Sequence, residues 1–169
     1  MFKKIKMILI MLLLSFIITN CSTPSINKIS STLRITKPRL DFYTSSLKYS
    51  LKKKNNTAHI SIFYTKTGKN KVIPSEYIDR FNMFINSIKP SHFITYEEAN
   101  LGLKDPEYKL TIFINNNPKF IINIFNDKFV SIHPWDGMYE PDLINISSFQ
   151  TKSNIYNLAE FIIKNNFNE

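Results

Sequence analysis

The sequence has few of the residues from which most recognisable catalytic and metal sites are built. Its 169 residues include one cysteine, three histidines and three glycines. A single cysteine excludes a disulfide within the chain, and the histidines are not spaced as metal ligands on a helix. The sequence also lacks a nucleophile elbow, a zinc-protease motif and a glycine-rich phosphate loop. We therefore expect no metal and no cofactor, and a core that depends on apolar burial alone.

Arginine is also scarce. The chain has 22 basic against 13 acidic residues, but the arginines are limited to Arg34, Arg39 and Arg80. Recognition of nucleic acid favours the bidentate arginine fork, so we expect no nucleic-acid partner. A lysine-rich balance instead favours anionic surfaces such as lipid headgroups or envelope polymers. The abundance of Lys, Asn and Ile is equally typical of an AT-rich genome.

The first 20 residues have the parts of an export signal. Three lysines within residues 3–6 form a basic start, and a largely apolar run follows from Met7 to Ile18. This run of about twelve residues is shorter than the roughly 20 that a membrane-spanning helix needs. We therefore predict that residues 1–20 are a cleaved signal peptide.

The signal is followed at once by the single cysteine. The stretch Ile18-Thr19-Asn20-Cys21 resembles the bacterial lipoprotein box, in which an aliphatic residue and two small residues precede the cysteine, although Asn20 is larger than usual. The resemblance implies a diacylglycerol, with palmitate among its acyl chains, attached to Cys21. Two alternatives stay open: an ordinary signal peptide beside an incidental cysteine, and a retained N-terminal anchor helix.

Composition divides the remaining chain into a tether and one domain. Residues 21–40 are rich in Ser, Thr, Asn, Lys and Pro and are poorly suited to a packed core. As a flexible coil, about 19 such residues would span roughly 25 Å. Residues 41–169 are long enough for a single folded domain.

Apolar periodicity within 41–169 predicts an α+β fold. Two helices are expected, one opening at Pro74 and ending before Pro90, the other capped by Ser153. Extended segments are expected at Phe42–Leu51, Ala58–Tyr64, Lys71–Ile73, His92–Tyr96, Tyr108–Ile114, Lys119–Phe125, Lys128–His133 and Leu143–Phe149. We predict an antiparallel β-meander sheet of about five or six strands with both helices packed on it.

The meander is the clearest part of this pattern. Apolar residues alternate from Tyr108 to Ile114, and Asn126-Asp127 has the residue types of a hairpin turn. Both alternating sets are apolar in the strand Lys119–Phe125. That strand is therefore predicted to be central in the sheet or covered on both faces.

One loop combines residues that could carry a function. The segment 133–139, HPWDGMY, holds the one tryptophan and follows a predicted strand. Trp135 and Tyr139 could form a recognition platform, because such side chains give large contact areas at low entropic cost. Alternatively, Trp135 plugs one end of the sheet. His133 and Asp136 could act as an acid–base pair, although no motif supplies a nucleophile.

The domain resembles a family of small uncharacterised lipoproteins from AT-rich Gram-positive bacteria of clostridial type. The resemblance covers about residues 57–165 and includes Asp105-Pro106-Glu107-Tyr108-Lys109-Leu110 leading into a hairpin, the Gly137-Met138-Tyr139 loop and a closing helix. It implies no activity, because no activity is assigned to such families.

These observations predict a protein attached by lipid to the extracytoplasmic face of the cell membrane. We expect a non-enzymatic binding module that contacts an envelope protein or an anionic polymer through His133, Trp135, Asp136 and Tyr139. The alternative is an envelope hydrolase that uses His133 and Asp136. An accessory subunit of a larger membrane complex is a third interpretation.

Overall fold

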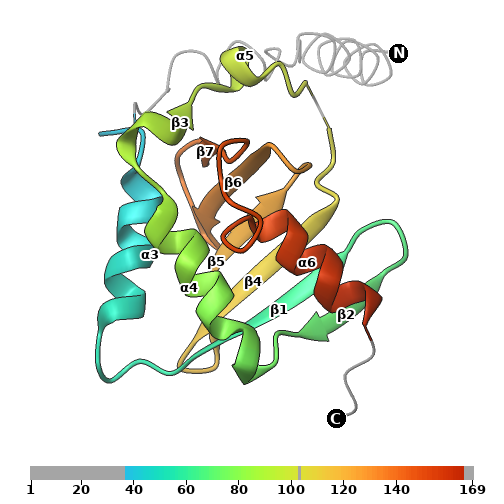
Figure 1. Ribbon diagram of the computed structural model, residues 1–169. Coiled ribbons are helices and arrows are strands. Elements are labelled where there is room, and N and C mark those ends of the chain that lie inside the picture. Colours follow the sequence, from blue (N-terminus) through green and yellow to red (C-terminus); the bar gives the residue numbers. More distant parts are fainter. Residues whose placement is uncertain (1–36, 103, 166–169) are drawn as a thin grey trace, which may run out of the picture. The chain divides into compact units, whose positions relative to one another are not determined.

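The computed structural model describes residues 37–102 and 104–165 (Figure 1). The predicted signal peptide 1–20, the lipid site Cys21 and most of the tether 21–40 lie outside these residues. Among the described residues of that predicted tether, Lys37 contacts the domain, since its ammonium is 2.8 Å from Asp142.

The described chain forms one antiparallel sheet of seven strands in the order β2-β1-β4-β5-β6-β7-β3. The strands β4 to β7 form the predicted meander, and β5 is the middle strand of the sheet, as the sequence predicted. Their bounds are β1 Ala58–Tyr64, β2 Lys69–Val72, β3 Phe93–Ile94, β4 Tyr108–Ile114, β5 Asn117–Ile124, β6 Phe129–Pro134 and β7 Asp142–Asn145.

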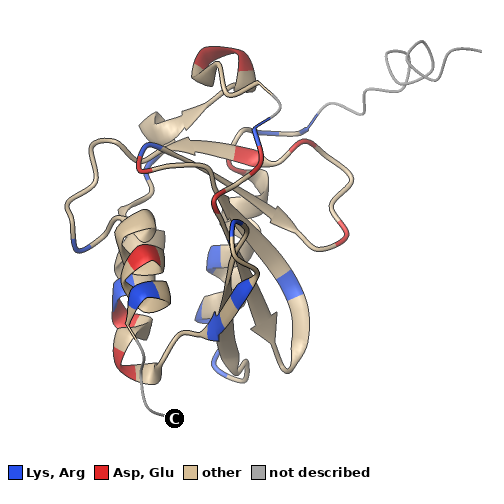
Figure 2. Ribbon diagram, turned by 90° about the vertical axis from the view of Figure 1, so that its right-hand side faces the viewer, with Lys and Arg blue, Asp and Glu red and all other residues tan. Residues whose placement is uncertain are grey.

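Three of the four described α-helices lie on one side of this sheet (Figures 1 and 2). Leu47 of α3, Phe84 of α4 and Leu158 of α6 belong to the same buried core. The helices are α3 Phe42–Lys52, α4 Ile78–Ser87, α5 Tyr96–Ala99 and α6 Ile155–Lys164, with 3₁₀ turns η1 Ser75–Tyr77 and η2 Pro90–His92. The architecture is the expected α+β class, with more strands and helices than predicted.

The prediction of a strand over Phe42–Leu51 was wrong, because this segment is helix α3. Tyr43, Leu47 and Leu51 recur every four residues, so they share one helical face, and the first two are buried. The first turn of α3 has no side-chain cap from Asp41. Tertiary packing therefore decides the conformation of a segment whose own residues favour neither state strongly.

The core lies between the sheet and these three helices. Alternate residues of each central strand point into it, as at Ile60 and Ile62 on β1 or Ile122 and Ile124 on β5, all nearly inaccessible to solvent. The strong alternation of buried and partly exposed positions follows from the two-residue side-chain period of a strand.

The opposite side of the sheet carries none of α3, α4 and α6, and we call it the open face (Figure 2). Near β6 it is partly covered by α5, where Tyr96 hydrogen-bonds the buried Ser131. Over β1, β4 and β5 its side chains are exposed or half-exposed. They are His59, Ser61 and Phe63 on β1, Lys109, Thr111 and Phe113 on β4, and Lys119, Ile121 and Asn123 on β5.

Candidate functional site

The segment 133–139, here called the recognition loop, presents two large apolar side chains to solvent. Trp135 is 61% exposed and Met138 is 80% exposed. The loop leaves the end of β6, and the Trp135 amide still donates to the Lys119 carbonyl of β5 at 3.0 Å. A tight turn follows, because the Gly137 amide donates to the Pro134 carbonyl at 3.2 Å.

The far end of the recognition loop is held by helix α3. The Tyr139 amide donates to the hydroxyl of the buried Tyr43 at 2.7 Å. The rings of Phe42 and Tyr139 pack edge to face with centroids 5.5 Å apart. Gly137 fits closely against this anchor, since a Cβ there would lie 3.2 Å from the Tyr43 hydroxyl. The loop is therefore fixed at both ends while its apolar tip stays in solvent.

The four residues predicted to form the binding site lie in different environments in the structure. Trp135 lies at the exposed tip, so the alternative in which it plugs one end of the sheet is wrong. Tyr139 is half-buried and belongs to the anchor of the loop. Asp136 is exposed on the turn, and His133 lies on the open face at the end of β6.

The structure does not bring His133 and Asp136 together. His133 Nδ1 is 2.9 Å from the Pro134 carbonyl oxygen, a group that can only accept, so Nδ1 carries the hydrogen. Its Nε2, 3.3 Å from the side-chain nitrogen of Asn123, then accepts from that amide. Both ring nitrogens are thus engaged by neutral partners. Asp136 makes no hydrogen bond with His133 in the described part of the chain.

Residues 37–102 and 104–165 contain neither a cluster of metal-ligand side chains nor a helix suited to crossing a membrane. Within them, no three His, Cys, Asp or Glu side chains gather as they would around a metal ion. None of the helices there has the length and hydropathy to cross a membrane.

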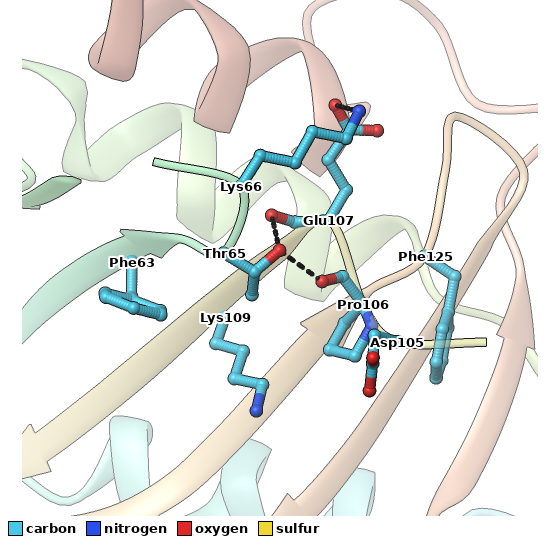
Figure 3. Close-up of a pocket in the computed structure, with 8 residues that line it drawn as sticks. All are labelled: Phe63, Thr65, Lys66, Asp105, Pro106, Glu107, Lys109 and Phe125. Atoms are coloured by element: carbon cyan, nitrogen blue, oxygen red, sulfur yellow. Dashed lines mark hydrogen bonds and ion pairs between the residues drawn. The ribbon is translucent and has the colours of Figure 1, made fainter. Parts of the chain in front are cut away.

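A depression of about 590 Å³ at one end of the open face was not predicted from the sequence (Figure 3). Phe63 and Phe125 stand on opposite sides of it, and Lys109 enters from β4. The other lining residues are Thr65, Lys66, Asp105, Pro106 and Glu107. Alternation places Phe63 and Lys109 on one face of their own strands. That the two are neighbours follows only from the pairing of β1 with β4, which the sequence does not reveal.

Hydrogen bonds make the wall of this depression rigid. The Thr65 hydroxyl lies within donor distance of the carbonyl oxygens of Pro106, at 2.8 Å, and Glu107, at 2.9 Å. The Lys66 ammonium pairs with the Glu107 carboxylate at 3.0 Å, and this hydrogen bond raises the pKa of Lys66. Glu107 is therefore already neutralised by a neighbour, whereas Lys109 has no ion-pair partner among the described residues.

Comparisons with known proteins identify the fold and the family. The crystal structure of a candidate lipoprotein from Clostridium perfringens matches with a TM-score of 0.66 at 20% identity, over 77% of this chain and 100% of that one. At this identity the match shows the shared fold alone. No curated protein matches the sequence. A family model matches residues 37–159, nearly the whole described domain, and the chain therefore belongs to the domain of unknown function family DUF4883.

Proposed function

We propose that this protein is a lipid-anchored, extracytoplasmic binding module that contacts an envelope component through the recognition loop. The observation that carries the proposal is the exposure of Trp135 and Met138 on a loop whose two ends are fixed. In these exposed positions the two side chains add little to the buried core, but Trp and Met are among the residues enriched at protein interfaces.

The anchoring of the recognition loop favours binding. A mobile loop loses conformational freedom when it binds, and each immobilised side chain costs about 0.5–1.5 kcal/mol. Here the contacts of Tyr139 with Tyr43 and Phe42 hold the backbone before any partner arrives. Trp135 can therefore bury most of its surface against a partner with little further ordering.

The hydrolase alternative has less support. A general base needs a free lone pair within reach of its substrate. In the structure the Nε2 lone pair of His133 accepts from Asn123, and among the described residues Asp136 makes no hydrogen bond that would orient the ring. The geometry therefore favours a binding module over an acid–base pair.

The membrane attachment is proposed from the sequence together with the fold. The lipobox-like stretch ending at Cys21 supplies the lipid site, and the tether 21–40 would let the domain stand clear of the headgroups. The structural neighbour from Clostridium perfringens is itself described as a candidate lipoprotein, which is consistent with this attachment.

Crosslinking in cells followed by mass spectrometry tests the binding module. We expect wild type to capture a discrete envelope partner and Trp135→Ala to lose it at matched abundance. Met83→Ala is the control, because Met83 is 44% exposed on α4, outside the loop. Retention of the same partner by Trp135→Ala would show that the loop is structural.

Fractionation of the same cells tests the anchor separately. We expect wild type in the membrane fraction and Cys21→Ser released from it or held as an unprocessed precursor. An unchanged membrane fraction with a fully processed Cys21→Ser chain would contradict the lipid anchor and leave the recognition loop unaffected.

A further inference from the structure

The strands of the open face carry charge of one sign, and the carboxylates of Asp105 and Glu107 lie beside the depression at one end. The five neighbouring strands β2, β1, β4, β5 and β6 contain four lysines and no Asp or Glu. Two of these lysines, Lys109 and Lys119, are exposed on the open face, and neither has an ion-pair partner within the described residues. A surface with unpaired cations and no carboxylate on its strands is complementary to an anionic partner.

Each of these lysines lies near an aromatic residue. Lys109 lies opposite Phe63, which is 39% exposed. The Lys119 carbonyl accepts the Trp135 amide, so the recognition loop continues from the open face. At the Lys119 end, where Phe113 lies opposite Pro118, His59 and Phe113 stack with centroids 4.5 Å apart and planes at 6°. Flat aromatic surfaces of this kind pack against the apolar faces of sugar rings.

Polar groups separate the aromatic rings. Ser61 lies opposite Thr111, and Asn123 lies opposite Lys109. Ser61 and the Asn123 amide already donate to Asn70 and His133. Insertion of this face into lipid would still remove water from the Thr111 hydroxyl and the Asn123 side-chain oxygen, at a cost of about 1–3 kcal/mol each by mutational scales. The same groups can hydrogen-bond the hydroxyls of a sugar. This pattern favours a glycan over a membrane surface.

The two lysines lie at separate positions along the strands. Lys109 lies opposite Asn123, four residues along β5 from Lys119. At about 3.3 Å per residue, the two positions are roughly 13 Å apart along the strands. Two anionic groups at a similar spacing on one extended polymer could each contact one ammonium group.

We propose that the open face, from the depression at Phe63 and Lys109 to Trp135, binds a sugar polymer that carries phosphate groups. Lysine binds phosphate as a compact point charge, without the bidentate geometry that arginine offers to both phosphate and carboxylate. The inference deepens the proposed function, because it rests on the recognition loop as part of a binding surface and names the chemistry of its partner.

Binding of the purified full-length chain in detergent to phosphomannan, a phosphate-bearing polysaccharide, tests the inference. We expect the double variant Lys109→Gln/Lys119→Gln to bind about tenfold more weakly, since two charge contacts are lost. The control is Lys53→Gln/Lys54→Gln, which removes the same charge from an exposed turn after α3 and should bind as wild type. Binding should also weaken with salt.

Three results would overturn the inference: no binding of phosphomannan by wild type, equal loss in both double variants, or equal binding of neutral mannan. Preferential binding to phosphatidylglycerol vesicles in place of phosphomannan would also overturn it and assign the face to lipid. These failures are distinguishable from failure of the proposed function, because capture of a protein partner that depends on Trp135 would still support the recognition loop.

Discussion

At the scale of single residues, Asp142 joins three parts of the domain. Its side chain is fully buried on β7. One carboxylate oxygen accepts the Thr44 amide in the first turn of α3 at 2.6 Å, and the other pairs with the Lys37 ammonium at 2.8 Å. Asp41, at the start of α3, does not cap the helix with its side chain, and Asp142 supplies this acceptor from a distant strand. A negative charge at the N-terminus of a helix is also favoured by the helix dipole.

Asp142→Ala should therefore be strongly destabilising. It leaves the mostly buried ammonium of Lys37 and the amide of Thr44 without their acceptor. Loss of one partner of a buried ion pair costs about 3–5 kcal/mol, and we expect a drop of this size in the free energy of unfolding in urea. Glu160→Ala is the control, because it breaks a solvent-exposed pair with Lys164 worth about 0.3–0.5 kcal/mol. Similar losses in both variants would contradict the bridging role.

Residues 115 and 116 show how far local sequence can determine backbone conformation. The predicted strands Tyr108–Ile114 and Lys119–Phe125 leave a short connection between them, in which both Asn115 and Asn116 have positive φ, at 52° and 64°. Asparagine tolerates this region better than other residues with a Cβ, so the turn between β4 and β5 could be found from its residue types. No information from the rest of the chain was needed.

At the scale of elements, those with strong periodicity were predictable and those fixed by distant contacts were not. The alternation of β4 and the apolar face of α6 were visible because burial on one side repeats at the period of each element. The α3 segment has a weak pattern, and its first turn is capped by a residue 98 positions away. Periodicity alone cannot reveal such a partner.

The candidate site was predictable only where a residue stands out in its local sequence. Trp135 was singled out because a rare, large residue stood in a loop after a strand. The open face was missed, because it requires knowing that α3, α4 and α6 share one side of the sheet. It also requires the pairing of β1 with β4, which places Phe63 beside Lys109 across a long sequence separation.

Helix α6 meets the sheet through a group of tyrosines with an unusual electrostatic environment. Tyr108 of β4 stacks on Tyr64 at 5.0 Å and packs edge to face with Tyr156 of α6 at 5.5 Å. Burial, followed by the nearby charge of Glu107, raises the pKa of Tyr108 well above its ordinary value of 10.0. Burial and Glu107 also raise the pKa of Tyr156.

This environment predicts alkaline unfolding. The folded state favours the neutral phenol of Tyr108. The stability that this group contributes is therefore complete below about pH 10, its unfolded pKa, and is lost as pH rises from there toward the higher folded pKa. Tyr108→Phe cannot ionise and should move the alkaline unfolding midpoint, followed by far-UV circular dichroism, to higher pH. Tyr49→Phe is the control, because Tyr49 is 74% exposed. The same shift in both variants would contradict a role for burial.

At the scale of the whole molecule, the domain is closed by its last helix. The core lies on one side of the sheet, and α6 contributes five buried residues to it: Ile155, Leu158, Ala159, Ile162 and Ile163. The helix also packs against α4 and lies over β1 and β2. The first strands of the chain therefore complete their burial only when its last residues are in place, which favours cooperative unfolding of the domain.

The family match ends at residue 159, inside α6, and this boundary can be tested against the core. A chain shortened to end at residue 159 loses Ile162 and Ile163, which are 0% and 6% exposed. Burial of each contributes roughly 1.5–3 kcal/mol, so the loss is comparable with the total stability of many domains, about 5–15 kcal/mol. We expect the chain ending at 159 to unfold at much lower urea concentration than one ending at 165, which retains every buried residue of α6. Equal urea midpoints for the two chains would show that the last turn of α6 adds nothing to the core, and that the family boundary is also the physical end of the domain.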